Sequence, residues 1–192
     1  MGIKKQRRTK KDGKEMSKKV LIISGSPRKG GNSDILCDRF MQGAKEFGNE
    51  VEKVFLHDLK IGHCVACYGC RETKKCVKKD DMEVLLEKMT EADVLVLATP
   101  VYFYSMDGML KTMIDRTLPR YTEIRDKDVY LIATAADGES AMRRTMDAME
   151  GFTDCLPGAI VRQKIYGAGV YQKGEVKDTP VYQRAYMAGK MV

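Results

Sequence analysis

The sequence predicts an α/β fold in which helices cover both faces of one parallel sheet. Three observations indicate this class. Five short apolar runs have the pattern of strands buried on both faces. Segments with apolar residues at helical spacing separate these runs, and turns containing Gly or Pro follow the first and third. Strands that alternate with helices in this way are typical of βαβ units. We find no internal repeat, so we expect residues 17–192 to form a single domain.

The first third of the domain contains two expected strands and one helix. Val20–Ser24 is a continuous apolar run before a Gly- and Pro-rich turn, which indicates a buried strand. A helix is expected to begin at Asp34, with Asn32 or Ser33 as its cap. Val51–Leu56 is the second expected strand.

The middle third begins with a polar loop and contains the third strand. The Cys-rich segment Lys60–Asp80 is expected to be this loop, and Asp81 opens the next helix. Val94–Ala98 is apolar throughout, which predicts a strand that Pro100 ends. The following helix is expected over about Asp107–Leu118.

The last third repeats the alternation. Strands are expected at Val129–Ala133 and Ile160–Ala168, with the helix Ser140–Phe152 between them. Thr179 is expected to cap a final helix that has Pro180 at its first position.

The net charge of +7 belongs to the N-terminus. Residues 1–19 carry nine basic and two acidic side chains, so the rest of the 192-residue chain is balanced. A balanced domain argues against a nucleic-acid partner, which requires a basic face. The chain shows neither the apolar run of a signal peptide nor about 18 consecutive apolar residues for a membrane span. We therefore expect a cytoplasmic protein without a membrane or nucleic-acid partner.

Residues 1–16 are expected to be a disordered basic tail, because they lack both helical and alternating apolar periodicity. Two interpretations of this tail stay open. It is either an arm for an acidic surface or an extension that precedes a start codon at Met16.

The segment Ser24–Ser33, with the sequence SGSPRKGGNS, joins the first strand to the first helix. Ligands bind at this place in doubly wound sheets, and the N–H groups of a helix start favour a phosphate. Ser26 and Ser33 can donate hydroxyls, and Arg28 can donate a charge-assisted bond. The loop is neither a P-loop nor a G-x-G-x-x-G fingerprint. A plain strand-to-helix turn is the alternative to a phosphate site.

A second loop, Thr99–Met106, follows the third strand at the same edge of the sheet. Its three successive aromatic residues cannot all be buried by one loop, so some should face a flat, redox-active ring. The alternative is that these aromatic side chains pack beneath the following helix, a role that suits Phe103 better than the two tyrosines. The expected ring contacts are Pro100, Val101, Tyr102, Phe103, Tyr104 and Ser105.

Four of the six cysteines lie within thirteen residues, at Cys64, Cys67, Cys70 and Cys76. In a cytosolic protein, clustered cysteines favour a metal site over disulfides. Structural zinc usually takes two C-x2-C pairs about 15–20 residues apart, whereas three cysteines at two-residue intervals are like the turn that wraps a [4Fe–4S] cluster. Zinc and free thiols remain alternatives. The other two cysteines, Cys37 and Cys155, are expected to be buried.

Together these motifs resemble the NADPH-dependent FMN reductase and iron–sulfur flavoprotein family. Ser24–Leu36 is similar to the family's phosphate loop, and Thr99–Arg116 is similar to its isoalloxazine loop and following helix. The cysteine spacing, with the following Asp-Asp-Met, is similar to its compact cluster motif.

The resemblance implies a flavodoxin-like five-stranded sheet of order 2-1-3-4-5, with the Cys-rich loop after the second strand. It implies FMN, with Ser24, Ser26, Arg28, Asn32 and Ser33 at its phosphate, and a [4Fe–4S] cluster on the four clustered cysteines. It further implies NAD(P)H as a co-substrate and a homodimer or homotetramer.

A protein that holds FMN and a cluster can connect a two-electron donor to one-electron carriers. We therefore expect an FMN-dependent oxidoreductase whose partners are small-molecule or protein electron donors and acceptors, with no catalytic side chain. Two alternatives stay open. One is an NAD(P)H-dependent FMN or quinone reductase without a cluster, and the other is a non-catalytic electron carrier.

Overall fold

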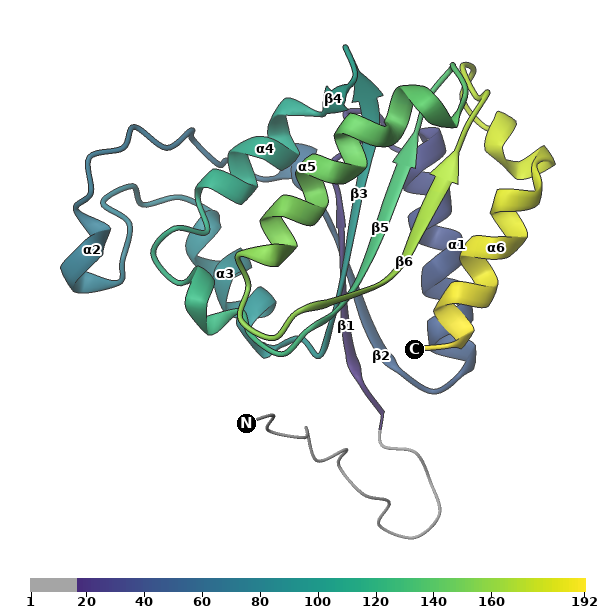
Figure 1. Ribbon diagram of the computed structural model, residues 1–192. Coiled ribbons are helices and arrows are strands. Elements are labelled where there is room, and N and C mark those ends of the chain that lie inside the picture. Colours follow the sequence, from purple (N-terminus) through teal and green to yellow (C-terminus); the bar gives the residue numbers. More distant parts are fainter. Residues whose placement is uncertain (1–16) are drawn as a thin grey trace, which may run out of the picture.

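A parallel sheet of strand order β2-β1-β3-β5-β6 forms the centre of the molecule (Figure 1). The computed structural model describes residues 17–192, and the disorder expected for residues 1–16 concerns a segment outside that range. The strands are β1 (Lys19–Ser24), β2 (Glu50–Phe55), β3 (Val94–Tyr102), β5 (Asp128–Thr134) and β6 (Ile160–Gly167). Counted along the chain, this is the expected order 2-1-3-4-5. A short antiparallel strand, β4 (Ser105–Met106), is added beside the end of β3.

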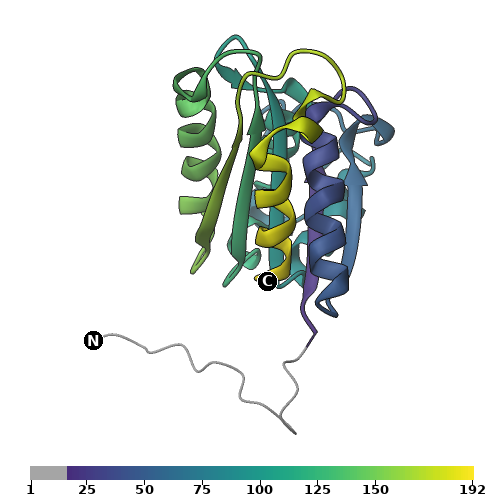
Figure 2. The same ribbon diagram turned by 90° about the vertical axis from the view of Figure 1, so that its right-hand side faces the viewer.

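Helices cover both faces of the sheet. Figure 2 shows α1 (Asn32–Glu46) and α6 (Pro180–Lys190) side by side on one face. The other face carries α3 (Met82–Glu91), α4 (Gly108–Asp115) and α5 (Arg143–Asp154). A short helix, α2 (Cys70–Thr73), lies within the Cys-rich segment, and 3-10 turns occupy Leu56–Asp58, Tyr121–Glu123, Glu139–Met142 and Glu175–Asp178. No helix within residues 17–192 is long and apolar enough to cross a membrane.

The apolar runs are strands because alternate side chains fill two different cores. In β1, Leu21 and Ile23 pack on the side of α3, α4 and α5. Val20 and Ile22 pack on the side of α1 and α6. All four side chains are buried. The sheet is therefore apolar on both faces, as the unbroken runs predict.

Pro100 does not end the third strand, contrary to expectation, since β3 continues to Tyr102. The pairing of β1 with β3 stops at Ala98. Beyond that point β3 borders only β5 and the short β4, so a proline without an N–H group is tolerated there. The next helix is shorter than expected. It ends at Asp115, and its N-cap Asp107 accepts a hydrogen bond from the Met109 N–H at 2.8 Å.

Two of the expected helix caps are also different. The N-cap of α1 is Gly31, so the expectation of Asn32 or Ser33 was wrong. Thr179 does occupy the N-cap position of α6, with Pro180 after it. Its hydroxyl donates to the Val176 carbonyl instead of capping the helix.

Helices α1 and α6 approach each other closely through two glycines. A Cβ atom on Gly43 would lie 2.1 Å from the Tyr186 carbonyl oxygen, and one on Gly189 would lie 2.1 Å from the Phe40 carbonyl oxygen. No side chain fits in either place without moving one backbone away from the other. The register of α6 on α1 thus requires both glycines.

We expect Gly43→Ala and Gly189→Ala each to lower the free energy of unfolding by about 2 kcal/mol or more, because the added methyl overpacks a backbone contact. Gly151→Ala is the matched control: this α5 glycine has open space around its Cβ position, so higher helix propensity should add up to about 1 kcal/mol. Urea unfolding measures all three variants. Equal stability of the Gly43 and Gly151 variants would contradict the packing described.

Candidate functional site

The loops after β1, β3 and β5 gather at one edge of the sheet. Ser24 at the end of β1 pairs with Ala98 of β3, and Ala98 pairs with Ile132 of β5. Because these strands are parallel neighbours, their carboxyl ends place the phosphate-loop segment and the aromatic loop at the same edge. This is the juxtaposition that the sequence predicts.

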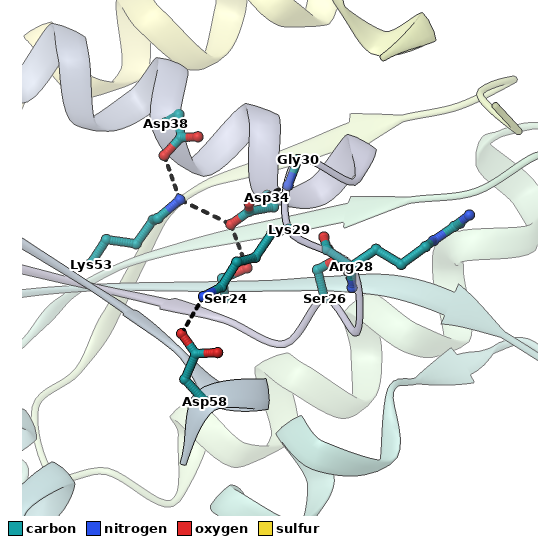
Figure 3. A network of polar contacts seen from close by, with 9 residues as sticks. All are labelled: Ser24, Ser26, Arg28, Lys29, Gly30, Asp34, Asp38, Lys53 and Asp58. Carbon is teal, nitrogen blue, oxygen red and sulfur yellow. Dashed lines mark hydrogen bonds and ion pairs between the residues drawn. The ribbon is translucent and has the colours of Figure 1, made fainter. Parts of the chain in front are cut away.

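A buried carboxylate, Asp34, holds the first loop in shape (Figure 3). Its Oδ1 accepts a hydrogen bond from the Ser24 hydroxyl at 3.0 Å, and its Oδ2 accepts one from the Gly30 N–H at 2.8 Å. Lys53 on β2 lies 3.0 Å from Oδ1 and compensates its charge. Partial burial acts to lower the pKa of Lys53, but hydrogen bonds to Asp38 and Asp34 raise it above the ordinary value.

Sequence reasoning missed Asp34. Acidic residues are common in the first turn of a helix, where they complement the helix dipole. The signal that could have found it is its place, directly after a Gly-rich loop that is expected to bind an anion.

The start of α1 leaves hydrogen-bond donors unused, which fits a phosphate. The helix has no side-chain cap at Gly31. The Ser33 hydroxyl is 1% exposed and has no partner among the described residues. Buried polar groups are almost always paired, so an orphan hydroxyl at a helix N-terminus indicates a place for an anionic ligand.

The loop is also shaped for a close backbone approach. A Cβ atom on Gly31 would lie 2.8 Å from the Ser26 hydroxyl oxygen and 3.0 Å from the Arg28 carbonyl oxygen. The Ser26 hydroxyl donates to that carbonyl at 2.8 Å and so closes the turn. The Arg28 side chain extends away from the Asp34 network, as Figure 3 shows.

The five expected phosphate residues differ in what they are free to bind. Arg28 is exposed, Ser33 is buried with an unpartnered hydroxyl, and the buried Ser26 hydroxyl donates to the Arg28 carbonyl. Ser24 is committed to Asp34. The Asn32 amide is also committed: its Nδ2 donates to the Gln172 carbonyl, and its Oδ1 accepts from two backbone N–H groups, those of Gly174 and Val176.

The second loop is a strained hairpin. β3 and β4 are joined by Phe103 and Tyr104, whose φ angles of 49° and 60° lie in the left-handed region. This is the conformation of a two-residue hairpin turn, and it costs roughly 1 kcal/mol or more for each non-glycine residue. The turn fully exposes Phe103, so it does not form a plug under the next helix.

The rest of the hairpin is less exposed than its tip. Tyr102, Tyr104 and Ser105 are exposed, and Pro100 and Val101 are half-buried. The Arg144 guanidinium lies 5.8 Å from the centroid of the Tyr104 ring. The aromatic side chains thus stand beside the phosphate-loop edge with their faces available to a ligand or a partner.

The four clustered cysteines line one hollow. None forms a disulfide; Cys64 and Cys67 are exposed, while Cys70 and Cys76 are half-buried. Left-handed backbone at Ala66, with φ of 52°, turns the chain between them, and the Ala66 N–H lies 3.5 Å from the Cys64 sulfur.

The sulfur atoms do not meet at one point. In residues 17–192 no three His, Cys, Asp or Glu side chains are close enough to hold a single metal ion. Four thiols around one hollow are donors that both a structural zinc site and an iron–sulfur cluster use. The donor set therefore fits an iron–sulfur cluster, and Cys64, Cys67, Cys70 and Cys76 would be its ligands.

A buried arginine anchors the Cys-rich segment to α4. Arg116 is 2% exposed, and its two terminal nitrogens bind the Asp80 carboxylate at 2.7 and 2.8 Å. It also donates to the Gly62 carbonyl at 2.5 Å. Its hydrogen bonds hold the pKa of Asp80 at about 2, below the ordinary value. Arg116 lines the same hollow as the cysteines, so it places a permanent cation beside four potential thiolates.

The remaining cysteines behave differently from each other. Cys37 is fully buried, and burial raises the pKa of its thiol. Cys155 is exposed, which overturns the expectation that it is buried. It lies at the C-cap of α5, where the amphipathic pattern no longer determines which side faces the core.

Comparison with known proteins gives consistent results. Residues 18–172 match the family model described as NADPH-dependent FMN reductase. An iron–sulfur flavoprotein of Methanocaldococcus jannaschii is 35% identical over 136 residues, which cover 70% of each chain. One from Methanosarcina thermophila is 40% identical over 52% of each chain. The match thus spans only about half the length of several of these relatives.

Two further comparisons concern a bacterial relative and a solved structure. A Bacillus subtilis protein named a putative NAD(P)H-dependent FMN-containing oxidoreductase is 30% identical over 62% of this chain and 67% of its own. A solved flavone reductase superimposes with a TM-score of 0.68 at 25% identity, over 90% of this chain and 60% of that one. The flavodoxin-like fold expected from the sequence is confirmed.

The Asp80–Arg116 pair should make the free energy of unfolding fall at acid pH. Because the pKa of Asp80 is lowered from 3.8 to about 2, the pair stabilises the fold fully above pH 4. That contribution is lost as the pH falls from about 4 to 2. Asp80→Asn should cost on the order of 3 kcal/mol at pH 7, since it leaves Arg116 buried without a counter-charge. The variant should also lose this part of the pH dependence in urea unfolding measured between pH 2 and 7; an unchanged profile would contradict the pairing.

Ser33→Ala should weaken FMN binding roughly 10-fold or more, the equivalent of one hydrogen bond to a charged group. The stability of the apoprotein should not fall, because the Ser33 hydroxyl has no partner to lose. Fluorescence titration of the apoprotein with FMN measures the first quantity, and urea unfolding measures the second. Ser17→Ala, an exposed serine at the opposite edge of the sheet, is the control. If the Ser33 variant bound FMN as tightly as the wild type, Ser33 would not be part of the phosphate site.

Proposed function

The chain belongs to the NADPH-dependent FMN reductase family, and we propose that it works there as an iron–sulfur flavoprotein. In this proposal it passes electrons between a reduced donor and one-electron carriers through FMN and a [4Fe–4S] cluster. The observation that carries the proposal is the arrangement of Cys64, Cys67, Cys70 and Cys76 around one hollow that also contains Arg116.

The electrostatics of the hollow support a cluster. Four thiolates would bring more negative charge than the loop could keep together without cations. Lys78 brings a positive charge to the hollow, and Arg116, which is paired with Asp80, lines one wall with a buried Nε that has no partner among the described residues. Clustered free thiols also persist in a reducing compartment, which supports a cytoplasmic location.

The residues at the sheet edge would hold FMN by its two ends. The loop N–H groups, Ser26, Ser33 and Arg28 would bind the phosphate. The hairpin of Tyr102, Phe103 and Tyr104 would supply an apolar surface for the ring. When bound, FMN supplies hydride acceptance together with one-electron release. In this proposal the protein contributes position and no catalytic side chain.

The partners follow from this chemistry. NAD(P)H is the co-substrate that the family name indicates, and the acceptor is a small molecule or a protein. We also propose a homodimer or homotetramer, because Phe103 at the hairpin tip and Val65, Tyr68 and Val77 on the Cys-rich segment expose apolar surface.

A second candidate is an NAD(P)H-dependent FMN or quinone reductase that assembles no cluster. The exposure of Cys64 and Cys67 favours it, since solvent-exposed thiols are free to remain unligated. The Bacillus subtilis relative carries a name of this kind.

Anaerobic purification followed by iron, sulfide and flavin analysis separates the two. We expect about four iron atoms and four sulfides per FMN. Cys70→Ala should lose most of the iron and keep FMN, because the phosphate loop is not touched. Cys155→Ala, the exposed cysteine outside the hollow, should retain both. Wild-type protein with full FMN and no iron would favour the cluster-free reductase.

The non-catalytic carrier is tested by mixing the purified protein with NADPH or NADH under argon. We expect the flavin absorbance to bleach, since a nicotinamide donor transfers hydride to FMN. A flavin that stays oxidised with both nucleotides would contradict a nicotinamide-dependent reductase and support the non-catalytic carrier.

A further inference from the structure

A second hollow lies beside the phosphate loop, on the face covered by α1 and α6. Its volume is about 520 Å³, within the range of small-ligand sites. Gly30 of the phosphate loop forms part of its wall, and Ile35, Arg39 and Gln42 of α1 form another part. The site described above does not use this hollow, because the FMN phosphate is assigned to the N–H groups and hydroxyls of the loop itself.

The hollow carries positive charge that the described residues do not compensate. Lys173 and Lys177 line it, and neither makes an ion pair within residues 17–192. Lys173 lies directly against the loop, since a Cβ atom on Gly30 would be 2.9 Å from its Cε and 3.3 Å from its Nζ. The acid in the wall, Asp38, is already paired with Lys53 at 2.5 Å.

Lys173 is held there by an ordered segment. The side chain of Asn32 makes three hydrogen bonds to the backbone of Gln172, Gly174 and Val176. The Glu175 carboxylate closes the same segment, because it accepts from the Gln172 N–H at 2.8 Å. Lys173 therefore lies in a backbone segment that is hydrogen-bonded to Asn32, the first residue of α1.

The other walls include apolar and aromatic side chains. Ile35, which is 9% exposed, and Tyr182 line the hollow. The Arg39 guanidinium lies 4.8 Å from the centroid of the Tyr182 ring, and its buried Nε has no partner among the described residues. A tyrosine stacked with Arg39, an apolar edge at Ile35 and the two lysines without ion pairs together match the chemistry of a phosphorylated adenosine.

We propose that this hollow binds the 2′-phosphoadenosine end of NADPH, and that Lys173 and Lys177 thereby select NADPH over NADH. The proposal rests on the proposed function only in taking a nicotinamide dinucleotide as the electron donor. It adds a recognition site for that donor at a place separate from the FMN phosphate.

The test uses the FMN-loaded protein and three probes: 2′,5′-ADP, 5′-AMP and inorganic phosphate. Calorimetry should show that 2′,5′-ADP binds at least 10-fold more tightly than either of the others. Lys173→Gln/Lys177→Gln should weaken 2′,5′-ADP binding at least 10-fold and leave the FMN content unchanged. Lys45→Gln, an exposed lysine in the last turn of α1, should bind like the wild type.

Steady-state kinetics give an independent readout. The double variant should raise KM for NADPH and leave KM for NADH and kcat unchanged. Equal affinity for 2′,5′-ADP and 5′-AMP, or phosphate binding as strong as that of 2′,5′-ADP, would overturn the proposal. Loss of FMN from the double variant would also overturn it, because Lys173 would then belong to the FMN site.

Failure of the proposed function gives a different result. A protein without iron, or one that NADPH does not reduce, would still bind 2′,5′-ADP through the two lysines if the hollow is a phosphoadenosine site. The two ideas are therefore tested by separate measurements.

Discussion

The Asp34 carboxylate joins four parts of the molecule that must be in register for the phosphate loop to exist. It bonds the end of β1 through Ser24, the loop through Gly30 and β2 through Lys53, while it sits in the first turn of α1. A buried negative charge beneath an anion site would normally repel the ligand. Lys53 removes that difficulty by compensating the carboxylate from the side away from the loop. The loop can then offer N–H groups to an anion, and the buried Ser33 hydroxyl stays without a partner among the described residues.

A second carboxylate plays a comparable part at the Cys-rich segment. This segment extends from the body of the molecule, and Figure 1 shows its helix α2 well away from the sheet. Asp80 and the Gly62 carbonyl, at the two ends of the segment, both bind Arg116 of the α4 C-cap. The cysteines between them are thereby tied to the helix that follows the aromatic hairpin. One buried arginine thus connects the two regions that we propose to take part in electron transfer.

The aromatic hairpin carries strain for which the core gives no reason. Phe103 and Tyr104 hold left-handed backbone while exposing large apolar side chains. Neither feature stabilises an isolated domain, and both fit the cofactor and partner contacts proposed for this hairpin. The hairpin is possible because β3 outlasts its pairing with β1 and offers a free edge to β4. Because β1 ends at Ser24 while β3 continues to Tyr102, the phosphate loop begins there and β3 is free to form the hairpin with β4.

The sequence by itself determined that apolar strands alternate with helices around one parallel sheet, and that the loops after the first and third strands meet at one edge, because burial on both sheet faces leaves an unbroken apolar pattern. The strand order came from the resemblance to a known family. It also grouped the four cysteines that line one hollow, and Ser26, Arg28 and Ser33 of one loop, since short motifs hold their own residues together. Only the tertiary structure decided which polar side chains are used internally. Asn32 binds the segment around Lys173 through partners that local patterns do not reveal, and Asp34 binds Lys53 of β2 as well as its own loop. Hydrogen bonds between residues more than a hundred positions apart depend on the packing of α1 against the last strand and helix, and no local spacing encodes them.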